Sequence, residues 1–123
     1  MEEREEDHEK ARRLFAQAAV QGEADAQHNL GLMHANGQGG PVDFETAAGL
    51  YRKAAEKDEA MAQYNLGGLY ECGAGVPRNH VEAIWWYRKA KEQGYEKARE
   101  PLARLLAEQR CSQCAAPARA AAA

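Results

Sequence analysis

The stretch Ala26-Gln27-His28-Asn29-Leu30-Gly31 recurs 36 residues later as Ala62-Gln63-Tyr64-Asn65-Leu66-Gly67. The match continues without a gap, and residues 26–61 share 14 of 36 positions with residues 62–97. Self-similarity at one fixed offset of this length is typical of a protein built from stacked repeats. The sequence therefore predicts an array of structurally similar units.

Each unit contains two stretches with helical periodicity. In the first half, Leu30 and Met33 match Leu66 and Leu69 of the next unit. In the second half, apolar residues recur at i, i+3, i+4, i+7, i+10 and i+11, which places them on one helical face that must be buried. In the first unit these residues are Phe44, Ala47, Ala48, Tyr51, Ala54 and Ala55.

A glycine-rich turn separates the two helices of a unit. Glycine accepts the positive φ that ends a helix, and a following proline prevents the helix from resuming. The turns are Gly37-Gln38-Gly39-Gly40-Pro41 and Gly73-Ala74-Gly75-Val76-Pro77. Asp43 and Asn79 stand just before the second helices, where their side chains can accept hydrogen bonds from free helical amides.

The same frame extends into both flanks and predicts an all-α solenoid of six helices. We expect helices over about Glu6–Gln21, Glu23–Asn36, Asp43–Lys57, Glu59–Cys72 and Asn79–Gln93, with a last one ending near Arg110 and Pro101 near its first turn. The predicted organisation is an N-terminal half repeat (1–25), two repeats (26–61 and 62–97), a degenerate C-terminal capping helix (98–110) and a disordered Ala-rich tail (111–123).

Composition excludes several classes of protein. A chain of 123 residues with a net charge of −3 is sized for one domain and is not suited to neutralising nucleic-acid phosphates. No apolar run approaches the ~18–20 residues of a membrane span, and the acidic N-terminus does not resemble an export signal, so we expect a cytoplasmic protein. Three cysteines, Cys72, Cys111 and Cys114, do not form a disulfide framework.

The glycines, alanines and aromatic residues of the unit resemble the Sel1-like repeat, a relative of the tetratricopeptide repeat. The shared pattern is Ala-Gln-x-Asn-Leu-Gly, then Gly-x-Gly with a proline, then Tyr-Arg-Lys-Ala. The resemblance implies a right-handed superhelix of antiparallel helix pairs that holds other proteins together. His34, Gly40 and His80 depart from the usual residues of the repeat.

Stacked helix pairs leave a concave surface lined by the first helix of each pair, which suits an extended peptide or a partner's helix. By analogy with tetratricopeptide repeats, the lining residues are His28, Asn29, Leu32 and Asn36 in one unit and Tyr64, Asn65, Gly68, Glu71 and Cys72 in the next. Asn29 and Asn65 can hydrogen-bond a peptide backbone, or they can satisfy polar groups between helices. Both interpretations are open.

The two tryptophans stand at different positions of the frame. Trp86 aligns with Leu50 and Leu14 and is predicted to lie in the core. Trp85 aligns with Gly49, where the frame does not demand a large apolar group, and is therefore a candidate contact residue. We expect instead that the terminal helix or the tail covers it.

No catalytic or metal-binding pattern accompanies the repeats. None of His8, His28, His34 and His80 has a histidine or cysteine at i+3 or i+4, and Cys111-Ser112-Gln113-Cys114 supplies only two potential zinc ligands. Arg52 and Arg88 are expected to pair with glutamates one turn later. The sequence predicts a noncatalytic adaptor without a cofactor. The alternatives are a metal- or thiol-dependent protein that uses the cysteines and a subunit that completes its ends by self-association.

Overall fold

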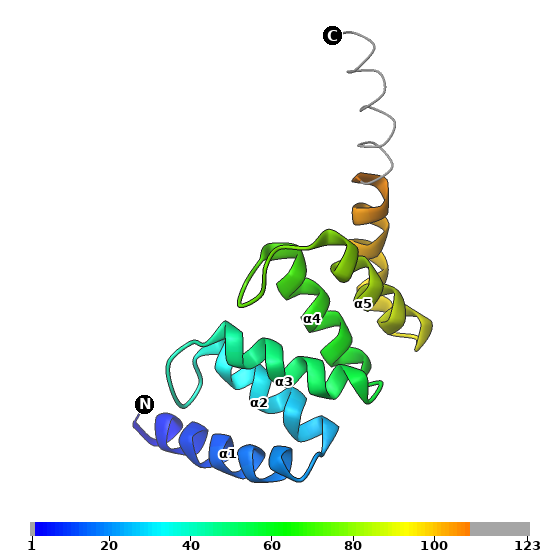
Figure 1. The fold of residues 1–123 in the computed structure, drawn as a ribbon. Helices are drawn as coiled ribbons and strands as arrows, with labels where there is room; N and C mark the ends of the chain where they lie inside the picture. The colour runs from blue at the N-terminus through cyan, green and yellow to red at the C-terminus, as the bar shows by residue number, and fades with distance from the viewer. Residues whose placement is uncertain (1, 109–123) are drawn as a thin grey trace, which may run out of the picture.

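The computed structural model describes residues 2–108 of the chain. The helices are α1 (Glu2–Val20), α2 (Ala24–Asn36), α3 (Phe44–Glu56), α4 (Ala60–Cys72) and α5 (His80–Glu92), followed by the 3-10 turn η1 (Glu96–Ala98) and a terminal helix over residues 99–108. The described residues form no strand, which confirms the predicted all-α class (Figure 1).

The helices pack in the order in which they occur in the sequence. Helices α2 and α3 form one antiparallel pair, α4 and α5 form the next, and α3 contacts α4 between the pairs. Helix α1 packs on α2, and η1 packs on α5. Figure 1 shows α1 at one end of the molecule and the terminal helix at the other. The molecule is therefore a short solenoid of two helix pairs with a single helix at each end.

The predicted caps and stops are confirmed. Gly37 and Gly73 end α2 and α4 in the left-handed conformation, with φ of 69° and 74°. Asp43 accepts a hydrogen bond from the Thr46 amide at 3.1 Å, and Asn79 accepts one from the Glu82 amide at 3.2 Å. Local residue choice thus sets where each second helix begins.

The core is built from alanines and tyrosines of the second helices against small residues of the first. Tyr51 and Tyr87 are 2% and 3% exposed. A Cβ atom added to Gly31 would lie 2.7 Å from the Tyr51 ring, and one added to Gly67 would lie 2.9 Å from the Tyr87 ring. Glycine at these positions lets the two helices of a pair approach closely.

Three details differ from the sequence-based expectations. Phe44, the first residue of α3, is 40% exposed, although the turn at Gly75 lies against its backbone. Arg52 pairs with no glutamate among the described residues; its guanidinium donates to the Tyr70 hydroxyl and lies 5.6 Å from the centre of that ring. Helix α1 begins before Glu6, since acidic residues in a first turn favour the helix dipole.

The last helix begins as predicted, with Pro101 near its first turn. The turn η1 precedes it, and Pro101 stands within its first turn, where the missing amide proton costs no helical hydrogen bond. The predicted end near Arg110, the predicted tail and two of the cysteines, Cys111 and Cys114, lie outside the described residues.

Candidate protein-binding groove

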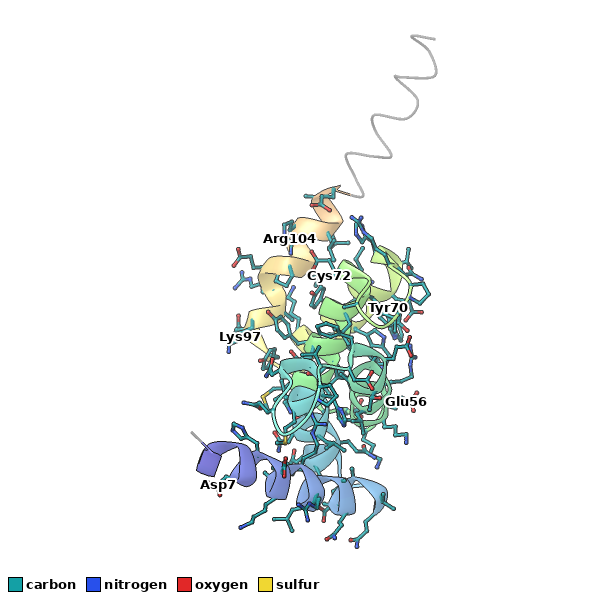
Figure 2. All side chains as sticks on the ribbon, turned by 90° about the vertical axis from the view of Figure 1, so that its left-hand side faces the viewer. Asp7, Glu56, Tyr70, Cys72, Lys97 and Arg104 are labelled. Atoms are coloured by element: carbon teal, nitrogen blue, oxygen red, sulfur yellow. The ribbon has the colours of Figure 1, made fainter. Side chains whose placement is uncertain are left out.

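Two adjoining hollows form a groove along the first helices α2 and α4 and the terminal helix. One hollow of about 350 Å³ is lined by Leu32, Ala35, Asn36, Tyr51, Tyr64, Asn65, Gly68, Leu69, Cys72 and Tyr87. The other, of about 550 Å³, is lined by Tyr64, Gly68, Glu71, Cys72, Tyr87, Lys97, Glu100, Pro101 and Arg104. The residues common to both are Tyr64, Gly68, Cys72 and Tyr87, so the hollows lie next to each other. Figure 2 shows Lys97 and Arg104 on one side of the molecule and Glu56 of α3 on the opposite side.

Most of the residues predicted from the repeat register line this groove. Leu32, Asn36, Tyr64, Asn65, Gly68 and Cys72 line the first hollow, and Glu71 lines the second. His28 is only 4% exposed, and Asn29 is half-buried and lines neither hollow. The register therefore brings α4 residues into the groove more fully than the α2 residues nearest the N-terminus of that helix.

Aromatic rings form the wall of the groove on the α4 side. The Tyr64 ring centre lies 5.6 Å from that of Tyr87 and 5.3 Å from that of Tyr95, in tilted arrangements. One unit earlier, His28 occupies the place of Tyr64 and lies 5.8 Å from Tyr51. Tilted contacts of this kind are favourable and hold the rings in place.

Asn65 joins the two units. Its side-chain nitrogen donates to Nε2 of His28 at 2.9 Å, which leaves the imidazole proton on Nδ1. Burial lowers the pKa of His28, although the charge of Asp25 opposes that shift, so the neutral acceptor form is favoured. The amino group of Asn65 is therefore occupied within the protein. This favours the interpretation that the group satisfies a polar partner between helices rather than a bound peptide.

A three-residue polar cluster marks the end of the groove at the terminal helix. The Tyr87 hydroxyl donates to Glu71 at 2.9 Å, and the Arg104 guanidinium pairs with the other carboxylate oxygen at 2.5 Å. Burial disfavours ionisation of Glu71, but the hydrogen bonds from Arg104 and Tyr87 outweigh it and keep the pKa of the carboxyl below its usual range. The pKa of Tyr87 is raised by burial and by Glu71. This cluster fixes the terminal helix against α4.

Arg104, Glu100 and Lys97 line the groove but are not among the residues predicted from the sequence. Arg104 aligns with Gly68 and Leu32, which were predicted, so extending the 36-residue frame by one more unit would have found it. Tyr51 and Tyr87 were assigned to the core alone. They are buried, yet both also line the first hollow.

Trp85 lies apart from the groove. It is 51% exposed on α5, with the Lys89 ammonium 5.1 Å from its ring, and it lines neither hollow. The described part of the terminal helix does not cover it, and the tail, the other segment expected to cover it, lies outside the described residues. Trp86 is 6% exposed, as predicted for a core residue.

The described residues also bear on membrane insertion and metal binding. None of its helices has the length and apolar character needed to cross a membrane. Between residues 2 and 108, no three histidine, cysteine or acidic side chains gather where they could hold a metal ion. Cys72 is an exposed free thiol inside the groove.

Comparison with known proteins gives a consistent family assignment. The Sel1 repeat model matches residues 3–23, 24–59 and 60–95. A Sel1 repeat protein from Oxalobacter formigenes is 42% identical, with a TM-score of 0.70 over 74% of this chain and 37% of its own. A protective antigen present in uropathogenic Escherichia coli strains, displaying an SLR fold, is 38% identical, with a TM-score of 0.72 over 73% of this chain and 19% of its own.

A third structure, cysteine-rich protein B of Helicobacter pylori, is 26% identical, with a TM-score of 0.70 over 74% of this chain and 68% of its own. A search among curated proteins gave no match. The chain thus spans well under half the length of the Oxalobacter and Escherichia structures that it resembles.

Proposed function

Because this chain belongs to the Sel1 repeat family, whose helical arrays commonly act as scaffolds for protein interaction, we propose that it is a noncatalytic adaptor. Its groove along α2, α4 and the terminal helix binds an extended segment of another protein. The observation that carries this proposal is that two neighbouring hollows share the lining residues Tyr64, Gly68, Cys72 and Tyr87.

The chemistry of the groove supports an uncharged segment as its occupant. No residue that lines the first hollow is charged. Burial raises the pKa of Tyr51 to about 12, so its hydroxyl stays neutral at physiological pH. Apolar side chains of a bound segment would pack on the tyrosines, and Asn36 is exposed to hydrogen-bond its backbone.

Charges lie only at the terminal-helix end of the groove. Glu71 is already paired with Arg104, while Lys97 and Glu100 are exposed and of opposite sign. Exposed charges of this kind influence association rate and specificity more than affinity. The central tyrosines therefore supply most of the binding energy in this account.

Gly68 gives the sharpest test, because it lines both hollows and its surroundings leave room for a side chain. A Cβ atom at this position would lie 3.5 Å from the Tyr87 hydroxyl, an ordinary contact, so a side chain fits without moving the fold. We expect Gly68→Arg to fill the groove and weaken binding at least tenfold, whereas the matched control Gly68→Ala retains binding. Substitutions of Tyr64 or Asn65 are less informative, since each also makes contacts within the fold.

The measurement is selection of peptides from a phage-displayed random library on the wild-type protein, followed by titration of the selected peptides against both variants. Selected peptides rich in uncharged residues, lost with Gly68→Arg and kept with Gly68→Ala, are the expected result. Peptides that bind both variants equally would place recognition outside the groove and refute the proposal.

A further inference from the structure

Two equivalent places in the repeat are filled differently. In the second unit, the Tyr87 hydroxyl donates to Glu71, and Arg104 of the terminal helix pairs with the same carboxylate. In the first unit, the residues at the three corresponding positions are Tyr51, Ala35 and Gly68. The tyrosine is therefore kept one unit earlier, while the two long polar side chains are missing.

The first hollow lies where those two side chains would stand. Ala35, Tyr51 and Gly68 all line it, and its volume is about 350 Å³. Its lining residues come from α2, α3, α4 and α5, the two complete helix pairs. The hollow is thus inside the array, and it does not depend on what lies beyond either end.

Tyr51 brings an unused hydrogen-bond donor to this hollow. Its side chain is 2% exposed. Among residues 2–108, the hydroxyls of Tyr70 and Tyr87 make hydrogen bonds within the protein, whereas that of Tyr51 makes none. The polar side-chain atoms that are enclosed without a partner do not include this hydroxyl, so it borders open space. A protonated hydroxyl in such surroundings favours an acceptor from a bound molecule.

Asn65 supplies a matching acceptor on the α4 side of the hollow. Its amino group is committed to Nε2 of His28 at 2.9 Å, while its carbonyl oxygen accepts from no donor of residues 2–108. The centre of the His28 ring lies 5.8 Å from that of Tyr51, so Tyr51 and Asn65 contact the same imidazole. The first hollow therefore presents one donor and one acceptor, and no charged side chain lines it.

A primary carboxamide has the complementary pair of groups. Its carbonyl oxygen accepts from Tyr51, and its amino group donates to Asn65. An apolar side chain would leave both protein groups without a partner. We propose that the first hollow binds one glutamine or asparagine side chain of the segment that occupies the groove. This inference rests on the proposed function and adds the residue type that the groove selects.

The second unit explains why the occupant is neutral. There the Glu71 oxygen lies 2.9 Å from the Tyr87 hydroxyl, so an acceptor at this place is well positioned to bond the tyrosine. The charge of Glu71 is balanced by Arg104. The residue equivalent to Arg104 in the first hollow is Gly68, so a carboxylate bound there would lose water without gaining a cation, which is costly.

The test uses a peptide selected on the wild-type protein, together with analogues in which its glutamine or asparagine is replaced by the matching acid or by alanine. We expect either replacement to weaken binding by about tenfold. Tyr51→Phe removes the hydroxyl alone. It should weaken the parent peptide by a similar factor and leave the alanine analogue nearly unchanged, because the two changes remove the same hydrogen bond. Tyr70→Phe removes a hydroxyl outside both hollows and is the matched control, with no effect on any of the peptides.

Three results would overturn the inference. Selected peptides without a carboxamide side chain, or an alanine analogue that binds as tightly as its parent, would show that the hollow does not select this group. Equal weakening of parent and analogue by Tyr51→Phe would show that the hydroxyl acts on something other than the carboxamide. A peptide that is lost with Gly68→Arg but indifferent to Tyr51→Phe removes this inference and leaves the proposed function standing. Peptides that tolerate Gly68→Arg, or the absence of any selected peptide, would remove both.

Discussion

Glycines at two equivalent positions decide how tightly the helices of each pair pack. Gly31 and Gly67 face the rings of Tyr51 and Tyr87, and neither site has room for a Cβ atom. Gly49, in α3, is a different case, because a Cβ there would meet nothing within 4 Å. The same residue type is therefore required at one kind of helical position and unfavourable at the other.

This difference predicts opposite effects of the same substitution. Gly67→Ala should lower the free energy of unfolding by about 1–2 kcal/mol, because overpacking outweighs the gain in helix propensity. Gly49→Ala should raise it by about 0.5–1 kcal/mol, since only the propensity changes. Urea denaturation monitored by circular dichroism measures both. Equal stabilisation by the two substitutions would show that the close approach of Tyr87 does not constrain the fold.

At the scale of helices, α2 and α4 are joined by the hydrogen bond from Asn65 to His28. The bond requires neutral His28, whose pKa burial lowers from its usual value of 6.5. Burial, with a smaller contribution from Arg12, also lowers the pKa of His34. The unfolded chain therefore takes up protons near pH 6.5 that the folded chain binds only at lower pH.

The contribution of the neutral histidines to the free energy of unfolding should accordingly be fully present above pH 6.5. It should be lost as the pH falls below 6.5 towards the lowered pKa values. His28→Gln removes one of these protons and should flatten the dependence of unfolding free energy on pH between 7.5 and 5.5, without abolishing it, because His34 remains. His80→Gln, which changes a histidine at the start of α5, serves as the control. An unchanged slope in His28→Gln would contradict the assigned role of the neutral imidazole.

The helices were predictable from sequence to a greater extent than their contacts. Periodicity, glycine stops and the caps Asp43 and Asn79 are local features, and the two units confirm one another. Arg52 on Tyr70 and Arg104 on Glu71 depend on how successive units rotate about the solenoid axis, which a periodic pattern does not specify. Phe44 was wrongly assigned to the core because its position on the helical face says nothing of how far the neighbouring unit extends.

The repeat register correctly predicted the groove residues of α4, but among the α2 residues it wrongly included His28 and Asn29. Tyr64, Asn65 and Glu71 line the groove as the analogy with tetratricopeptide repeats predicts, but His28 is buried and hydrogen-bonded to Asn65. The exposed Trp85 stands on α5, away from these residues. Whether a polar residue faces solvent or the next unit depends on its neighbour across the interface, which sequence spacing alone does not reveal.

At the scale of the whole molecule, the groove is the feature that the proposed function uses. The groove runs along first helices, ending on the terminal helix at Arg104.

The central claim is that the groove binds a segment of another protein, and Cys72 reports on it directly because its thiol lies exposed in both hollows. In a Cys111→Ser, Cys114→Ser background, we would measure the rate of Cys72 alkylation with and without a selected peptide or captured partner protein. The account predicts at least tenfold slower alkylation in the complex. A thiol introduced by Gly49→Cys, with Cys72→Ser, should be unaffected. Unchanged alkylation of Cys72 at saturating ligand would contradict the claim.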